Sequence, residues 1–249
     1  MPDILLDDSA GVRTLTLNRP EKKNAFTAAM YATLSDALAE AAADDAVRVV
    51  VLQGQVQIFS AGNDIADFLE QPPKGPDAPV FRLLRQLATF AKPLLAAVCG
   101  PAVGIGTTLL LHCDLVVAGD NAAFSLPFVN LGVAPEAGAS LLLPQLMGYQ
   151  RAAEALLLGE PFLAEAAQEV GLVNRIVVPN EANAVAQALA RKLAAKPQTA
   201  LLETKRLLKM GRTDALLARM DEEIAVFGKL LAQAPAQDAL HAFLNKRKA

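Results

Sequence analysis

Residues 94–118, LLAAVCGPAVGIGTTLLLHCDLVVA, carry the pattern that decides the fold. The apolar run Leu94–Val98 predicts a buried strand, and the small residues of Gly100–Gly106 predict a turn. Thr107–Cys113 then predicts a fully buried helix, and Leu115–Ala118 a further short strand. A strand, a glycine turn, a buried helix and another strand in succession are typical of an α/β fold.

The segment upstream continues this order. Val12–Leu17 alternates as a strand does, and Val47–Leu52 is a β-branched run that predicts a buried strand. Thr27 is the expected cap of a helix that runs to about Ala43. Shorter helices are predicted on either side of a proline-rich loop, Gln71–Pro79, over Asp64–Glu70 and Val80–Phe90.

The segment downstream is predominantly helical. Beyond about Tyr149, only Arg175–Val178 has strand character. We therefore predict a core over residues 1–195 and a helical C-terminal region over residues 196–249.

The composition narrows the class of protein. A chain of 249 residues that is 53% hydrophobic can bury a large core, and a net charge of −3 gives no electrostatic footprint for nucleic acid. No run of about 18 strongly apolar residues predicts a membrane span. Met1–Leu6 lacks the basic residues of a signal peptide, so we expect a cytoplasmic protein. Cys99 and Cys113 form no CxxC pattern, which argues against zinc and against a disulfide framework.

Two glycine turns supply the first chemical signal. Phe59–Asp64 and Gly100–Gly106 each lead from a strand through small residues into a helix. Backbone N–H groups at a helix N-terminus are unsatisfied and can bind an anion or a developing oxyanion. Taken alone, the first turn is more simply explained as an ordinary strand-to-helix connection, with Asp64 in a capping role, and the second by tight helix packing. Together, the turns offer the two donors that an oxyanion hole requires.

Several blocks of the chain, in order, resemble the enoyl-CoA hydratase/isomerase, or crotonase, family. The resemblance covers about Val12 to Val178 well and the C-terminal helices loosely. The matching blocks are Leu17-Asn18-Arg19-Pro20 with Asn24-Ala25, Phe59–Asp64, Gly100–Gly106 with Cys113-Asp114, Phe124–Phe128 with Leu131-Gly132, and Ala164–Ala167 with Gly171-Leu172-Val173.

This resemblance implies a spiral of ββα turns that assembles as a homotrimer or a dimer of trimers. The substrate is expected to be an acyl-CoA thioester, without a metal or a separate cofactor, because coenzyme A is part of the substrate. The thioester oxygen would accept hydrogen bonds from the N–H groups of Asn63 and Ile105. The resemblance places the substrate along Ala25, Ala61, Gly62, Asn63, Asp64, Ile65, Gly104, Ile105 and Phe128. Candidate phosphate partners are Lys22, Lys23 and Lys246 or Arg247, for which solvated surface charge is the simpler interpretation.

The family's hydratases use two glutamates, and this chain has neither. Thr108 and Phe128 stand where those carboxylates belong. A glutamate is found instead at Glu136, in a Pro-Glu-x-Gly pattern similar to that of peroxisomal-type 3,2-enoyl-CoA isomerases. The resemblance therefore implies that Glu136 carries a proton between two carbons of a 3-enoyl thioester.

Three alternatives stay open at this stage. One is a hydratase or another crotonase-type reaction on a CoA thioester, and another is a non-catalytic acyl-CoA-binding protein. The third is a carboxylate–metal hydrolase, for which the sequence has no clustered ligands. For Glu136 itself, the simpler role is a loop residue that faces water or caps the following helix. His112 is expected to be a hydrogen-bonded core histidine, and Phe243 to pack or to line a neighbouring subunit's site.

Overall fold

The structure, a computed structural model, describes residues 1–73, 75 and 77–246, the side chain of the last residue excepted. A six-stranded sheet has the order β1-β2-β3-β4-β6-β9, and only β1 runs antiparallel to its neighbour. Its strands are β1 (Ile4–Ser9), β2 (Val12–Leu17), β3 (Val49–Gln53), β4 (Leu94–Val98), β6 (Leu115–Gly119) and β9 (Arg175–Val177). The α/β class predicted from the sequence is confirmed.

A second, smaller sheet gives the fold its spiral form. It consists of β5 (Pro101–Val103), β7 (Ala123–Ser125) and β8 (Phe162–Leu163). The chain passes from β4 in the large sheet to β5 in the small one, and again from β6 to β7. These two turns of the chain thus each contribute a strand to both sheets, in agreement with the spiral that the resemblance implied.

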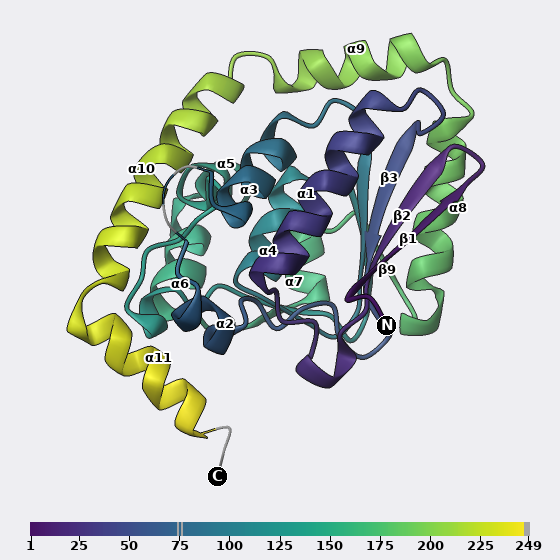
Figure 1. The fold of residues 1–249 in the computed structure, drawn as a ribbon. Helices are drawn as coiled ribbons and strands as arrows, with labels where there is room; N and C mark the ends of the chain where they lie inside the picture. The colour runs from purple at the N-terminus through teal and green to yellow at the C-terminus, as the bar shows by residue number, and fades with distance from the viewer. Residues whose placement is uncertain (74, 76, 247–249) are drawn as a thin grey trace.

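Helices cover both faces of the large sheet (Figure 1). On one face lie α1 (Ala28–Ala43) and α3 (Pro79–Thr89), which pack against each other. On the other face lies α8 (Ala182–Ala194). Its contact residues repeat every fourth position, a spacing that keeps them on one side of the helix. They are Ala182, Ala186, Ala190 and Ala194, all buried against strand residues. Their small side chains allow the helix to approach the sheet closely.

Three helices form the C-terminal region, α9 (Gln198–Lys209), α10 (Thr213–Leu231) and α11 (Ala234–Lys246), and lie along the outside of the molecule (Figure 1). α10 contacts α3 and α5, while α11 contacts α2. The remaining α-helices are α2 (Ile65–Glu70), α4 (Ile105–Thr108), α5 (Ala139–Met147), α6 (Tyr149–Leu158) and α7 (Ala164–Glu169). The domain boundary after residue 195 stays a prediction.

The structure differs from the sequence prediction at one helix and at several strands. The helix expected over Thr107–Cys113 begins at Ile105 and tightens at Leu109–His112 into a 3₁₀ turn. The strands β1, β5, β7 and β8 were missed. Other 3₁₀ turns lie at Pro20–Lys22, Val129–Leu131 and Pro179–Glu181.

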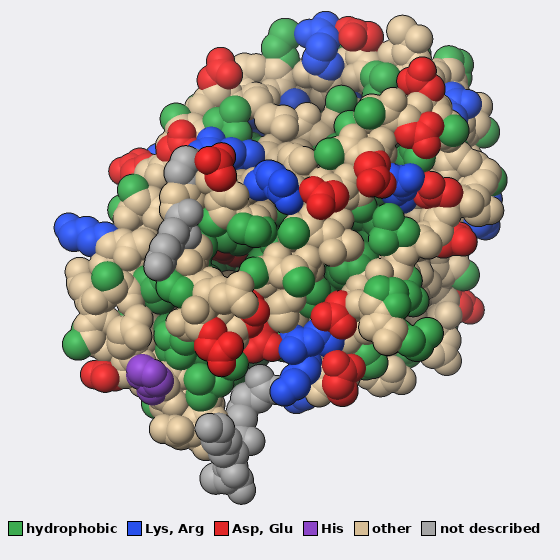
Figure 2. All heavy atoms as spheres, in the orientation of Figure 1, with side chains coloured by type: hydrophobic (Ala, Val, Ile, Leu, Met, Phe, Trp, Pro, Cys, Tyr) green, Lys and Arg blue, Asp and Glu red, His purple; other side chains and the backbone are tan. Residues whose placement is uncertain are grey.

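The described helices include none with both the length and the apolar character to cross a membrane. Acidic and basic side chains are interspersed on the face seen in Figure 2, without a broad area of one sign.

Candidate active site

The two glycine turns lie side by side. Ser60 and Ala102 form a parallel bridge, in which the N–H of Val103 donates to the carbonyl of Ser60 over 2.9 Å. Gly62 has a φ of +87°, and a Cβ there would stand 2.9 Å from the carbonyl oxygen of Val103. A Cβ on Gly106 would stand 3.1 Å from Ser60. Both glycines are therefore required by the contact between the turns.

The N–H groups of Asn63 and Ile105 have no acceptor within the described residues. Phe26 pairs with the first turn through the carbonyl of Gly62 and the N–H of Asp64, both over 2.8 Å, so the N–H of Asn63 points away from Phe26. Ile105 is the first residue of α4, where a helix cannot supply an acceptor. The two expected oxyanion donors are thus free to bind a ligand oxygen.

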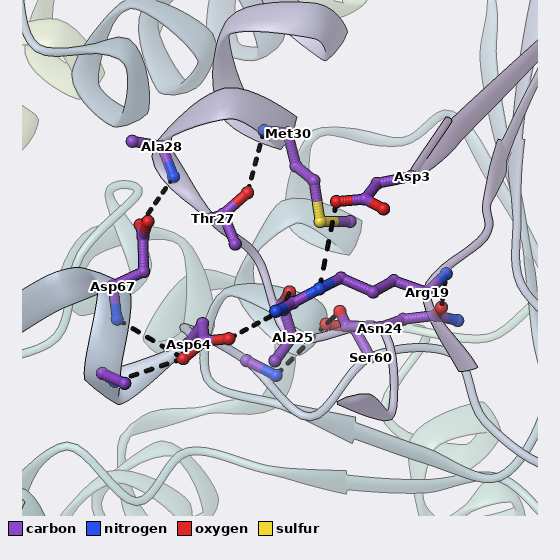
Figure 3. Close-up of polar contacts among 12 residues, drawn as sticks. Asp3, Arg19, Asn24, Ala25, Thr27, Ala28, Met30, Ser60, Asp64 and Asp67 are labelled. Atoms are coloured by element: carbon purple, nitrogen blue, oxygen red, sulfur yellow. Dashed lines mark hydrogen bonds and ion pairs between the residues drawn. The ribbon is translucent and has the colours of Figure 1, made fainter. Parts of the chain in front are cut away.

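Arg19 holds the first turn in place (Figure 3). Its guanidinium donates to Asp64 over 2.7 Å and to the carbonyl of Ala25 over 3.0 Å, and lies 3.9 Å from Asp3. Asp64 also accepts from the N–H groups of Ala66 and Asp67 and so caps α2, as predicted. Burial acts to raise the pKa of Asp64, but the hydrogen bonds from Arg19 and the helix amides together lower it. The carboxylate therefore stays charged and keeps the turn rigid.

Asn24 joins the same network. Its side chain accepts from the N–H of Arg19 over 2.8 Å and donates to the carbonyl of Phe59 over 3.0 Å. The hydroxyl of Ser60 donates in turn to the carbonyl of Asn24 over 2.9 Å (Figure 3). The Asn-Arg-Pro and Asn-Ala blocks of the sequence thus act as the support of the first turn.

A cavity of about 410 Å³ opens beside both turns. Seven of the predicted substrate-binding residues line it: Ala61, Gly62, Asn63, Ile65, Gly104, Ile105 and Phe128. Ala25, Asp64 and Glu136 do not. Ala25 and Asp64 lie beneath the turn in the Arg19 network. A Cβ on Gly104 would meet nothing within 4 Å, so this glycine leaves room on the cavity side.

The cavity wall is largely apolar and is shared between the core and the C-terminal helices. The apolar side chains are Phe68, Val103, Leu131, Val133, Phe227, Leu231, Leu240 and Phe243. Phe243, from α11, therefore lines the cavity of its own chain. The rings of Phe68 and Phe227 meet edge to face, with centroids 5.9 Å apart.

Glu136 is buried, with 4% of its surface exposed, so the alternative of a water-facing loop residue is wrong. Its Oε1 and the hydroxyl of Thr108 lack hydrogen-bond partners in the described part of the chain. Burial raises the pKa of Glu136 to about 8, and the charge of Glu223 acts in the same direction. The nearby Thr108 hydroxyl opposes this shift, although the two groups make no hydrogen bond of normal geometry.

The sequence interpretation missed two residues beside Glu136. Glu223 of α10 is 5% exposed and accepts hydrogen bonds from the N–H groups of Gly138 and Ser140 over 2.6 and 2.9 Å. It, and not Glu136, caps α5. Tyr31 of α1 donates its hydroxyl to the side chain of Asn63 and interacts electrostatically with Glu136. Tyr31 thus contacts the side chain of the residue whose backbone N–H is the first expected oxyanion donor.

The other sequence candidates take structural roles or lie outside the description. His112 is buried with Nε2 2.8 Å from the carbonyl of Ala137, as expected for a core histidine, and burial lowers its pKa to about 4. Lys22 and Lys23 are exposed. Arg247 and the side chain of Lys246 lie outside the described residues.

With this geometry in view, the family can be decided. The sequence profile described as Enoyl-CoA hydratase/isomerase matches residues 7–249. The chain belongs to this family.

Relatives within the enoyl-CoA hydratase/isomerase family differ in their reactions. The chain is 36% identical to 2,3-dehydroadipyl-CoA hydratase and 38% identical to 1,2-epoxyphenylacetyl-CoA isomerase, both of Escherichia coli, over 99% of this chain and 97% of each relative. It is 34% identical to enoyl-CoA delta isomerase 2 of Rattus norvegicus, over 98% of this chain and 64% of that protein. Family membership therefore indicates CoA-thioester chemistry without fixing the reaction.

Among solved structures, that of Pseudomonas aeruginosa OdaA superimposes with a TM-score of 0.95. It is 47% identical and covers 98% of this chain and 99% of its own.

Proposed function

We propose that this chain is an enoyl-CoA isomerase that moves the double bond of a 3-enoyl-CoA to position 2. The observation that carries the proposal is Glu136, a buried carboxyl with one unpartnered oxygen and a pKa raised to about 8. A carboxyl with such a pKa both accepts and releases a proton near neutral pH, as a proton shuttle must.

The proposed reaction has two proton transfers. The carboxylate of Glu136 takes a proton from C2 of the acyl group, and the electron pair spreads over the thioester oxygen, C2 and C4. The N–H groups of Asn63 and Ile105 donate to that oxygen as it becomes negative. Glu136 then returns the proton to C4, which leaves the double bond between C2 and C3. Removal of one such oxyanion donor costs about 2.7–4 kcal/mol of transition-state stabilisation in other enzymes.

The residues at the hydratase positions support an isomerase. Hydration requires a positioned water and a managed proton, and the side chains of Thr108 and Phe128 cannot act as general acid or base. The Thr108 hydroxyl, at the position of a hydratase glutamate, lies near Glu136, which supports a role for Glu136 in that region. The similarity to the rat delta isomerase agrees with this interpretation.

An assay of 3-enoyl-CoA and 2-enoyl-CoA as substrates tests the proposal. We expect isomerisation of the first to exceed hydration of the second, and Glu136→Gln to lose at least about 100-fold in kcat while acyl-CoA binding persists. Glu165→Gln, an exposed glutamate of α7, is the matched control and should retain wild-type kcat. Rapid hydration without isomerisation would favour the hydratase alternative, and binding without turnover the non-catalytic one.

The proposed reaction also requires that Glu136 lie close to the acyl group of a bound substrate. The carboxyl of Glu136 must reach C2 and C4, within about 3.5 Å, in a crystal structure with a bound acyl-CoA analogue. The reaction as proposed uses no metal or redox group. We further propose a cytoplasmic homotrimer or dimer of trimers in lipid metabolism; light scattering tests the assembly.

A further inference from the structure

We infer that Glu223, on the C-terminal helix α10, is a positioning residue for Glu136. Its carboxylate fixes the turn that carries Glu136 and holds a second negative charge beside that carboxyl. The inference deepens the proposed function and rests on it, because positioning matters only if Glu136 transfers a proton.

The turn after Glu136 depends on this contact. Ala137 and Gly138 have φ angles of +63° and +71°, a left-handed conformation that is unfavourable for Ala137. Glu223 accepts from the N–H of Gly138 over 2.6 Å, and from the N–H and the hydroxyl of Ser140 over 2.9 and 2.6 Å. Three donated hydrogen bonds to one buried carboxylate hold the turn and the start of α5 in a single geometry.

Packing of α10 against the turn adds to this constraint. A Cβ on Gly138 would stand 2.2 Å from a methyl group of Leu216, so α10 leaves no space at this point. The hydroxyl of Ser140 also accepts from Arg219 over 3.2 Å. The turn is therefore held against α10 by polar contacts and by the close packing of Leu216 on Gly138.

The charges that face Glu136 come from α10. Burial raises the pKa of Tyr31, on α1, well above its ordinary value, and it lowers the pKa of His112, on the 3₁₀ turn Leu109–His112, to about 4. Both groups are therefore neutral between pH 5 and pH 9. Glu223 is the group whose charge adds to burial in raising the pKa of Glu136. Burial also raises the pKa of Glu223, while its hydrogen bonds from Ser140 and Gly138 and the charge of Arg219 act in the opposite direction. A second anion beside Glu136 makes it a stronger base towards C2.

Two variants at Glu223 separate charge from position. Glu223→Gln removes the charge, and we expect the midpoint of the kcat/KM–pH profile to fall by about half a pH unit or more and kcat to fall about tenfold. Glu223→Asp keeps the charge but shortens the side chain by a methylene, so the midpoint should stay and kcat should fall. The matched control is Asp214→Asn, which neutralises an exposed carboxylate in the first turn of the same helix and should change neither quantity.

A readout without catalysis separates this inference from the proposed function. The melting temperatures of the wild type and Glu136→Gln are compared from pH 5 to pH 9, with and without Glu223→Gln. Above pH 8, Glu136→Gln should melt at a higher temperature than the wild type, because it has no charge to bury. We expect this difference in melting temperature to shrink when Glu223 is replaced. A midpoint and a melting difference in Glu223→Gln that match those of Asp214→Asn would overturn the inference. If Glu223→Gln does not fold, wild-type kcat in Glu223→Asp would overturn it. An inactive wild type that keeps the melting difference would reject the proposed function instead.

Discussion

At the scale of single residues, Glu136, the proposed proton carrier, has a cost in stability. Its pKa is about 8 in the folded chain and 4.5 in the ordinary state, so the folded protein binds more protons between these values. The free energy of unfolding must then fall as pH rises from about 4.5 to about 8, by up to about 1.4 kcal/mol per pH unit. The carboxylate form of Glu136, which the proposed reaction needs, is therefore the form that lowers the stability of the folded protein.

Glu136→Gln tests whether the free energy of unfolding falls as the pH rises. Below about pH 5, both side chains are neutral, and the two proteins should have similar melting temperatures. Above pH 8, the variant should be the more stable one, because it has no charge to bury. Differential scanning calorimetry across this range measures the difference. A difference in melting temperature that does not change with pH would mean that Glu136 titrates normally.

How far the sequence predicts the site depends on the kind of residue. Glu136 was predicted because its Pro-Glu-x-Gly pattern resembles that of peroxisomal-type isomerases, and the two turns were predicted because glycines mark them. Glu223 was missed because its partners lie 85 and 83 residues away. A signal was present nevertheless. Leu216, Met220, Glu223 and Phe227 share one buried face of α10, where a glutamate requires a polar partner.

At the scale of elements, the contact between the two turns matters most. The small residues in the sequence predicted the two turns, but only the pairing of Ser60 with Ala102 in the structure shows that the turns touch. Short strands such as β5 and β7 were not predicted, because three residues carry too little periodicity to be recognised. The early start of α4 has a similar cause: Gly104, not a polar cap, precedes it.

Gly62→Ala should break the contact between the turns. The added methyl group meets the carbonyl of Val103 and imposes a side chain on a φ of +87°. We expect a loss of about 2–3 kcal/mol in stability, with a fall in kcat because the N–H of Asn63 moves.

Gly228→Ala is the matched control, since this helical glycine of α10 has nothing within 4 Å of its added Cβ. It should gain up to about 1 kcal/mol in stability. Urea unfolding and steady-state kinetics measure both variants. Equal stability of the two would show that the turns tolerate separation.

At the scale of the whole molecule, the C-terminal helices complete a cavity that the core begins. The two glycine turns supply the polar side of the cavity. The helices α10 and α11 supply apolar side chains, namely Phe227, Leu231, Leu240 and Phe243. The sequence predicted helices in this region but could not show that they form the wall, because that depends on how α10 and α11 pack. Under the proposed function, this wall limits the length of the acyl chain.

Phe227→Leu tests the role of the wall. The change removes a ring that lines the cavity and meets Phe68 edge to face, while it keeps an apolar side chain against the core. We expect kcat/KM for 3-enoyl-CoA substrates to shift towards longer chains by about 10-fold or less, since each buried methylene contributes about 0.8 kcal/mol. Leu208→Ala, at a residue of α9 that is 76% exposed, controls for substitution of an apolar side chain outside the cavity. A chain-length profile that stays unchanged in Phe227→Leu would place the acyl group elsewhere, and the C-terminal helices would then have only a structural role.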